Sequence, residues 1–443
     1  MGKKDRHIRT FSFRAYAWQQ FRRHKPAMIS LYTIVFLFLI AVIAPYLATD
    51  KPWYVRYKGE SFFPAFTTKQ SYVLKDEATG ETEKLSVSQT EWRSLKAERI
   101  IWAPVPYAPG KSDLLNFGHK SPGGKQFMRD ASGNRMEISV RFRHWLGTGA
   151  KGEDVLAGMI HGARISLTIG LLSMLIASVL GLALGAAAGY YGDDRLFFRR
   201  GTVWLAIPGI FFAWFYAFTV RSYILTDALA ASTVYFLFHL LVSLTIFALI
   251  MMIFCLLSFP LNRFRYFSER ISIPVDLFVS RMIEIMISLP KIIFIITIAA
   301  IAKRSILNVI LIIGFTSWTG IARLVRAEML RIRNLDYIAA ARVSGLKDHR
   351  IIFRHALPNA LAPALVSIAF GVASAILAES SLSFLNIGVP EDTVTWGALL
   401  NEGRTNIKAW WLILFPGLAI FLTVTVYNLL GEGLRDALDP RLK

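Results

Sequence analysis

The apolar run MISLYTIVFLFLIAVIAPYL, residues 28–47, decides the fold class of this chain. Its length matches the roughly 20 residues that an α-helix needs to cross a hydrocarbon core about 30 Å thick. The run is longer than the core of a signal peptide and no small-residue cleavage site follows it, so we expect a retained membrane anchor. Hydrophobic residues make up 54% of the 443 residues, more than a soluble domain needs.

Similar apolar runs recur along the chain. The sequence predicts about eight transmembrane helices, at residues 28–47, 163–190, 202–220, 232–259, 283–302, 306–327, 360–382 and 410–430. Between the first two, residues 49–145 contain no run long enough to cross a bilayer, and segments at 53–59 and 71–75 are typical of strands. We therefore expect an all-α polytopic membrane protein with an extracytoplasmic soluble domain, containing β-strands, after the first span.

The predicted division of the chain follows these runs. We expect a cytoplasmic N-terminal tail at 1–27, the first transmembrane helix at 28–48, the extracytoplasmic domain at 49–145, the second transmembrane helix at 146–194, a two-helix membrane hairpin at 195–273 and the remaining helices at 274–443.

The formal net charge of +20 does not by itself indicate nucleic-acid binding. Basic residues gather before the first span, at Lys3, Lys4, Arg6, Arg9, Arg14, Arg22, Arg23 and Lys25. The positive-inside rule places such a cluster in the cytoplasm, and an even number of spans returns Arg441 and Lys443 to the same side. Lys303 and Arg304 then violate the rule. Membrane topology explains most of the basicity, so we expect no nucleic-acid partner and both termini in the cytoplasm.

The second span carries Gly181, Gly185 and Gly189 at four-residue spacing. This spacing puts three positions without a side chain on one helix face, where another helix can approach closely. The alternative is that small residues are simply frequent in membrane helices.

The sequence contains no motif typical of an enzyme active site. The single cysteine, Cys255, lies in an apolar run, and the His residues are scattered, so we expect no catalytic site and no metal site. The triplet at Gly110 has the Gly-Lys-Ser end of a phosphate-binding loop, but Val105 stands where that loop needs its first glycine. Any ATP hydrolysis would therefore occur on another chain.

Residues 331–359 read RIRNLDYIAAARVSGLKDHRIIFRHALPN and join two spans on the cytoplasmic side. The pattern predicts a helix at 337–343, a break at Gly345, a second short helix at 351–355 and a stop at Pro358. The small residues give one helix a flat surface, and the arginines supply charge for a membrane face or an acidic groove.

This segment resembles the cytoplasmic EAA loop of ABC-importer permeases, whose pattern is Glu-Ala-Ala, three residues, Gly, nine residues, then Ile-x-Leu-Pro. Ala339 stands in place of the Glu and His355 in place of the Ile. The resemblance implies that the residues coupling this chain to an ATPase are Asp336, Tyr337, Ala340, Ala341, Arg342, Gly345, Leu346, His355, Leu357 and Pro358.

Other segments are similar to the dipeptide and oligopeptide permeases, among them 146–166, 379–385 and 433–440. The outer segments 50–52, 55–57, 63–64 and 102–104 look like those of microcin C-type peptide importers. The hairpin at 195–273 has no counterpart there and is inserted in a six-helix type I permease core.

The resemblance implies a bacterial inner-membrane protein that forms the pathway for peptides or peptide-like solutes. It implies these partners: a second permease subunit, one or two ATP-binding subunits that hold ATP and Mg, an extracytoplasmic solute-binding protein, a peptide substrate and membrane lipid. No cofactor is expected on this chain.

Four further residues are candidates for the pathway or its gating. Glu379 would face the pathway or lie in water at the outer interface. Pro290, which follows Arg281 and Glu284, would kink a span near its cytoplasmic end or simply begin a helix. Two other functions stay open at this point: a membrane scaffold or receptor that keeps the permease fold without transport, and an enzyme whose active site is the outer domain.

Overall fold

Helices dominate the computed structural model, which describes residues 13–75, 82–93, 95, 97–129 and 134–438. The predicted basic residues before Phe13, and Arg441 and Lys443 at the other terminus, lie outside the described residues. Among the described helices, seven are long and apolar enough to cross a membrane, or eight if one bent pair counts as a single span. The predicted all-α polytopic fold is confirmed.

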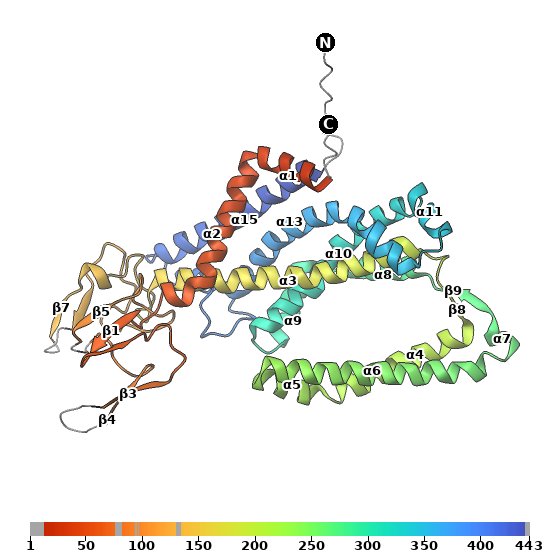
Figure 1. Ribbon diagram of the computed structural model, residues 1–443. Coiled ribbons are helices and arrows are strands. Elements are labelled where there is room, and N and C mark those ends of the chain that lie inside the picture. The colour runs from red at the N-terminus through yellow and green to blue at the C-terminus, as the bar shows by residue number, and fades with distance from the viewer. Residues whose placement is uncertain (1–12, 76–81, 94, 96, 130–133, 439–443) are drawn as a thin grey trace, which may run out of the picture.

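The spanning helices lie near the predicted runs (Figure 1). They are α2 (Lys25–Leu47), α3 (Val155–Tyr191), α4 (Arg200–Trp214) with the π-helical turn η2 (Phe215–Thr219), α6 (Thr233–Leu261), α10 (Ile306–Ile332), α13 (Leu357–Phe384) with the short segments before it, and α15 (Trp411–Leu438).

One predicted span is wrong as a single helix. Residues 283–302 belong to two short helices, α8 (Val275–Ser288) and α9 (Lys291–Ile301), which are bent by 83° relative to each other. The cause is Pro290, because a proline disfavours the helical conformation in the residue before it and Leu289 is extended, at φ −93° and ψ 133°.

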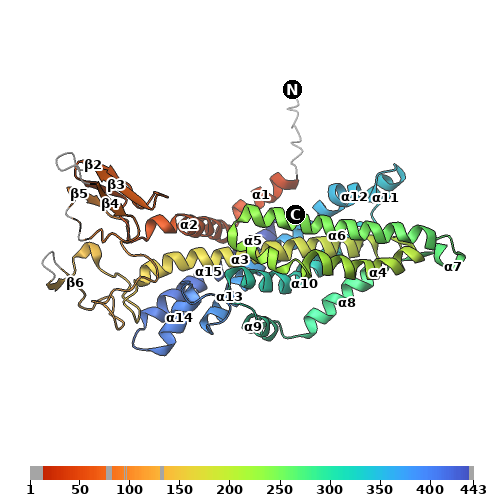
Figure 2. The ribbon, with the colours of Figure 1, turned by 90° about the horizontal axis from the view of Figure 1, so that it is seen from below.

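The central bundle is built around α3. Helices α2, α10 and α13 pack against it, and α15 packs against α2 and α13. Seen from below, α3 runs from the outer domain along the bundle (Figure 2). The shared core of these helices includes Ile313, Ile321 and Met329 of α10, all fully buried.

The glycines of α3 lie against α10. A Cβ built at Gly181 would lie 2.7 Å from the Cβ of Ile321, and one at Gly185 would lie 2.5 Å from the carbonyl oxygen of Ala322. A Cβ at Gly189 would lie 2.5 Å from the Cβ of Met329. Real Cβ atoms do not approach neighbours so closely, so each glycine permits a helix contact that a side chain would prevent.

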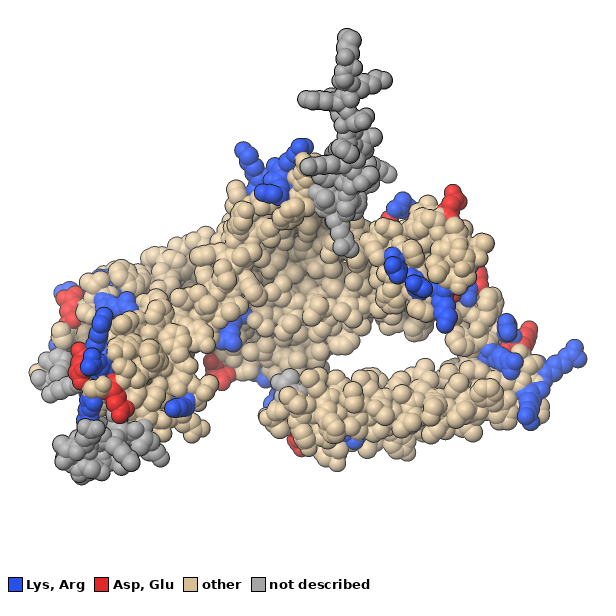
Figure 3. All heavy atoms as spheres, in the orientation of Figure 1, with Lys and Arg blue, Asp and Glu red and all other residues tan. Residues whose placement is uncertain are grey.

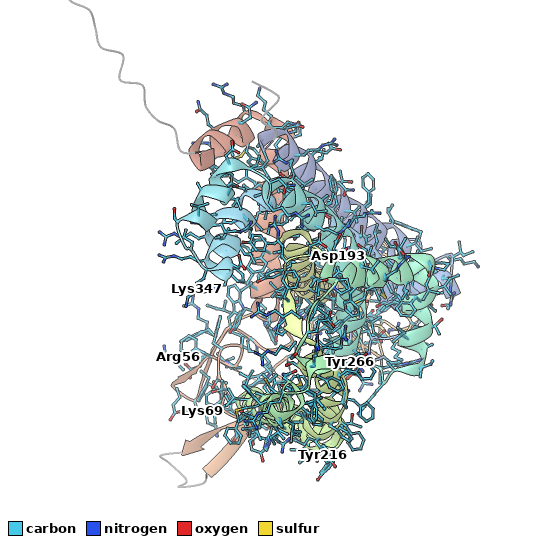
Figure 4. All side chains as sticks on the ribbon, turned by 90° about the vertical axis from the view of Figure 1, so that its right-hand side faces the viewer. Arg56, Lys69, Asp193, Tyr216, Tyr266 and Lys347 are labelled. Carbon is cyan, nitrogen blue, oxygen red and sulfur yellow. The ribbon has the colours of Figure 1, made fainter. Side chains whose placement is uncertain are left out.

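The hairpin forms a separate arm. It consists of α4, η2, α5 (Ser222–Ala231) and α6, and its neck contains α7 (Arg265–Ser268) and the antiparallel strands β8 (Phe197–Arg199) and β9 (Arg270–Ser272). Figure 3 shows open space between this arm and the bundle, and Figure 4 marks the arm with Tyr216 and Tyr266. Its large apolar side chains are exposed, as in helices that face lipid.

The outer domain holds small antiparallel sheets. β2 (Glu60–Phe62), β1 (Tyr54–Tyr57) and β5 (Arg99–Ile101) form one in that order, with Val55 opposite Phe62. β3 (Ser71–Lys75) pairs with β4 (Thr82–Ser86), and β6 (Phe127–Arg129) pairs with β7 (Arg135–Glu137). Three further helices lie outside the bundle core and these sheets: α1 (Phe13–Arg23), the 3₁₀ helix η1 (Val140–Phe142) and α14 (Trp396–Thr405). Charged side chains gather on the outer domain at the left, over α1 at the top, and at the right over the end of the bundle and the neck of the arm (Figure 3).

A buried imidazole holds the outer domain to α3. His144, fully buried, has its Nδ1 2.8 Å from Asp154 and its Nε2 3.3 Å from Asp113. Asp154 is also the N-cap of α3 and accepts a hydrogen bond from the backbone N–H of Ala157 at 2.6 Å. Burial alone would lower the pKa of His144, but its hydrogen bonds to Asp113 and Asp154 outweigh burial and raise that pKa.

Replacing Gly185 with leucine is expected to destabilise the α3–α10 contact. The added side chain would meet backbone atoms of Ala322, which cannot move aside alone, and such overpacking costs about 1–3 kcal/mol. Gly417→Leu in α15 is the matched control, since nothing lies within 4 Å of a Cβ added there. We expect thermal unfolding of the purified Gly185→Leu protein several degrees below wild type, and equal midpoints for the two variants would contradict the packing role.

Raising the pH is expected to loosen the His144 junction. The pKa of His144 is raised in the folded state, so its stabilisation is complete below its ordinary value of about 6.5 and is lost as the pH rises through the folded pKa. Burial opposes ionisation of Asp113, but hydrogen bonds from His144 and Asn116 lower its pKa. The stability that ionised Asp113 contributes to the fold is therefore lost only at acidic pH.

The measurement is the midpoint of thermal unfolding, detected by tryptophan fluorescence at a series of pH values above about 6.5. The midpoint of the wild-type protein should fall as the pH rises, and the His144→Gln variant should lack that slope. An identical slope in the variant would show that another group is responsible.

Candidate functional site

The segment 331–359, here called the coupling segment, lies at the end of the bundle opposite the outer domain (Figure 1). It contains the end of α10, α11 (Asp336–Val343), α12 (Asp348–Ile351), the π-helical turn η3 (Ile352–Ala356) and the start of α13. Gly345 separates α11 from α12 with φ +75° and has open space around its missing side chain. The turn therefore needs glycine for its backbone conformation, not for room.

The second predicted helix does not stop at Pro358. The chain continues through α12 and η3 directly into α13, and Pro358 lies in the first turn of α13. A proline ring clashes with the carbonyl four residues before it, here that of Arg354. Arg354 belongs to the π-helical turn, whose wider hydrogen-bond spacing displaces its carbonyls and accommodates the ring.

One face of the coupling segment is part of the core. Ile338, Ile351 and Ala356 are fully buried in the main hydrophobic cluster. Of the residues predicted to couple, Ala341, Leu346, His355 and Leu357 are half-buried, and Asp336, Tyr337, Ala340, Arg342, Gly345 and Pro358 are exposed.

The other face is apolar and open. Val343 is 89% exposed and Phe353 is 70% exposed, on either side of the Gly345 turn. In Figure 4, Lys347 marks this turn at the edge of the molecule. Val343 lies outside the candidate spans, and Phe353 lies in the first turns of the span Asp348–Phe384. Apolar side chains exposed at this end of the bundle, on a segment whose opposite face is fixed in the core, are typical of a surface that binds another protein.

Tyr190, at the end of α3, connects both short helices to the bundle. Its hydroxyl donates a hydrogen bond to Asp348 of α12 at 2.6 Å and accepts one from Arg342 of α11 at 3.3 Å. A further contact runs from the side chain of Asn359 to the hydroxyl of Tyr337 at 3.1 Å. The coupling segment is thus held to α3 and α13 by polar contacts as well as by its buried face.

The start of α8 is fixed close by. Asp276 forms a bidentate ion pair with Arg326 of α10, one contact being 2.7 Å. The backbone N–H of Leu277 donates to Asp193, which follows α3, at 3.0 Å. The ends of α3, α8 and α10 therefore meet next to the coupling segment, and Asp193 is labelled there in Figure 4.

Glu379 lies neither on an open pathway nor in water. Its carboxylate is fully buried in α13 and accepts hydrogen bonds from Ser166 at 2.7 Å and Ser383 at 2.8 Å, with Ser380 at 3.4 Å. Hydroxyl groups compensate the cost of burying a polar carboxyl group. This cluster joins α3 to α13, so both environments left open by the sequence differ from the observed one.

The other gating candidates lie on the bent pair. Arg281 and Glu284 form an exposed ion pair on α8, 2.6 Å apart, and Pro290 lies at the 83° break. The proline therefore does both things that the sequence left open: it bends the chain, and α9 begins directly after it.

Within the described ranges there is no group of three or more His, Cys, Asp or Glu side chains arranged to hold a metal ion.

Sequence reasoning missed Tyr190 and Asp348. A tyrosine at the end of an apolar helix is typical of a membrane interface, and nothing local distinguishes it. Its partner lies far along the chain, so only the folded bundle brings them together.

Removing the Tyr190 hydroxyl is expected to loosen the coupling segment. A hydrogen bond to a charged group contributes about 1.5–3 kcal/mol, so Tyr190→Phe should speed amide hydrogen exchange across 336–351 by roughly tenfold or more. Tyr191→Phe removes the same atom from the neighbouring residue, which makes no side-chain hydrogen bond in the described part of the chain, and serves as the control. Unchanged amide exchange in Tyr190→Phe would show that the Tyr190 hydroxyl does not hold the coupling segment to α3.

Comparison with known proteins agrees with this architecture. Residues 266–443 match the family described as the inner-membrane component of binding-protein-dependent transport systems. Residues 12–63 match the N-terminal transmembrane domain of oligopeptide transport permease C. The first match contains the entire coupling segment.

Curated relatives extend the match over most of the chain. The inner membrane ABC transporter permease protein YejE of Escherichia coli is 27% identical over 426 residues, 96% of each chain. The dipeptide transport system permease protein DppC of Alkalihalophilus pseudofirmus is 30% identical over 301 residues, 68% of this chain and 73% of that one. The glutathione transport system permease protein GsiD of Pectobacterium atrosepticum is 30% identical over 313 residues, 70% and 77% of the two chains.

These relatives are transport permeases, so neither the scaffold nor the enzyme alternative is favoured. The long apolar helices and the position of the coupling segment agree with that family. The chain belongs to the inner-membrane permeases of ABC importers of the dipeptide/oligopeptide type.

Proposed function

We propose that this permease carries peptides or peptide-like solutes inward, driven by a separate ATPase that docks on the coupling segment. The observation that carries the docking proposal is the two-sided coupling segment. Ile338 and Ile351 fix one face in the core, while Val343 and Phe353 expose the other. A partner that bound the exposed face would move the attached helices, and rigid-body motion of this kind produces alternating access.

Peptide as the substrate is supported by the named relatives, among them a dipeptide and a glutathione permease. We further propose that the transporter is of the microcin C type, because the sequence segments of the outer domain resemble those of such importers. ATP and Mg would be held by the partner subunits, with no cofactor on this chain. The complete assembly would include a second permease subunit, one or two ATPases and a solute-binding protein.

Both termini would lie in the cytoplasm, on the side of the coupling segment. The domain at 49–145 would then lie outside the membrane, where we propose that it contacts the solute-binding protein or shapes the outer gate. Its junction with α3 through His144 would transmit such a contact to the helix that also carries Tyr190.

The test is ATP-driven uptake of a labelled peptide into proteoliposomes that contain the assembled transporter and its binding protein. Val343→Asp should reduce both ATPase binding and uptake by roughly tenfold or more, because it places a charge in an apolar contact. Ile407→Asp, at an apolar position before α15 that is also largely exposed, should leave both at the wild-type level.

An equal loss in both variants would contradict docking on the coupling segment. Uptake that proceeds without ATP would contradict the importer mechanism. Stable assembly with an ATPase but no movement of any peptide would support the scaffold alternative instead.

A further inference from the structure

A polar pocket lies on the helix bundle, away from the coupling segment, and is open to the surface of this chain, where Lys291 and Ser374 are exposed. It has a volume of about 210 Å³ and lies between α3, α9, α10 and α13. Its lining includes Lys291, Ser317, Ser367, Ser374, Met174 and Phe370. Three hydroxyls and one ammonium group in a bundle of apolar helices are an unusual composition for packing alone.

The pocket lies at mid-depth. Ser317 lies near the middle of α10 and Met174 near the middle of α3, and the two serines of α13 also lie far from its ends. A site that binds a solute during passage is expected at this depth, where it is equally far from both sides of the membrane.

The break at Pro290 brings the lysine to the pocket. Because α8 ends at Ser288 and α9 starts again at Lys291 after an 83° bend, the chain changes direction at the pocket instead of crossing the bundle as one helix. Lys291 is the first residue of α9, and its Nζ donates a hydrogen bond to the hydroxyl of Ser317 at 3.0 Å.

The ammonium group has no anionic partner in the part of the chain that the structure describes. A charged lysine at mid-membrane depth costs several kcal/mol unless water or an anion compensates it. The hydroxyl of Ser317 donates to the carbonyl of Ile313 at 2.7 Å, and that of Ser374 donates to the carbonyl of Phe370 at 3.1 Å. Ser367 makes no side-chain hydrogen bond with the described residues, so its hydroxyl is available as a donor.

Apolar side chains line the pocket next to the ammonium group of Lys291. Met174 and Phe370 contribute apolar surface, and a Cβ at Gly371 would lie 2.2 Å from the Cε of Met174, so this wall is closely packed. An ammonium group, an available hydroxyl and adjacent apolar surface together fit a carboxylate attached to an apolar side chain.

We propose that Lys291 binds the terminal carboxylate of the solute midway across the membrane, with Ser367 donating to the same group. This inference rests on the proposed function and names the part of the peptide that is recognised on the pathway. Lys291 acts as a specificity-determining residue: its charge pairs with the carboxylate, and the neighbouring apolar wall contacts the last side chain.

The test measures peptide binding to the purified permease–ATPase complex without the solute-binding protein, so that only the pathway contributes. A labelled peptide with a free C-terminus is compared with its C-terminal amide. Wild type should bind the free acid roughly tenfold more tightly than the amide, the range expected of one charge-assisted contact. Lys291→Met should bind both peptides as weakly as wild type binds the amide, and Lys291→Arg should retain the preference.

Lys303→Met is the matched control, because Lys303 lies just beyond the other end of α9 and outside the pocket lining. It should bind both peptides as wild type does. Equal binding of acid and amide by wild type, or no binding of either, would overturn the proposal. Loss of both peptides together with loss of subunit assembly in Lys291→Met and Lys291→Arg would instead assign Lys291 to a subunit contact.

The two proposals fail separately. ATP-driven uptake that is insensitive to Lys291→Met would leave the importer function intact and overturn the carboxylate site. A preference for the free acid without any ATP-driven uptake would do the reverse.

Discussion

The close approach of α3 and α10 is the contact on which the rest of the structure depends. Gly181, Gly185 and Gly189 remove the side chains that would hold the two helices apart, and α10 fills that space with Ile321 and Met329. Lipid provides no hydrophobic force between helices, so this pairing depends on close van der Waals contact. Because α3 also runs from the outer domain to the coupling segment, fixing it against α10 connects the two ends of the molecule.

Polar side chains fix both ends of α3 and its contact with α13. His144 and Asp154 secure the outer end of α3, and Tyr190 secures the coupling helices at its other end. Glu379 joins α3 to α13 through serine hydroxyls. Lys291 differs from these groups, since it lines a pocket and its described contact is a single serine. That difference is the reason for proposing Lys291, and not one of the buried groups, as a contact for the solute.

The sequence predicted the class of fold because apolar run length is a local property, and the runs at 28–47 and 306–327 became helices close to those limits. It also located the Gly345 turn. It was wrong in predicting one span at 283–302, which is two helices that meet at Pro290, and in predicting that a helix stops at Pro358, where the helix continues. Local patterns gave no sign of the tie between Tyr190 and Asp348, of the hydroxyls around Glu379 or of the Lys291 pocket. Each joins residues on different helices, so it exists only after the bundle packs.

If an ATPase docks on the coupling segment as proposed, its closure should move that segment and the α3–α10 pair as one rigid body. The most direct measurement is the distance between spin labels at Leu335, just before α11, and Leu175 of α3, both exposed, in a chain whose single cysteine, Cys255, has been replaced by serine. In the reconstituted transporter, the account predicts the same distance distribution without nucleotide and with ATP bound. A shift greater than the width of that distribution would show that the coupling segment moves independently of α3 and would contradict the account.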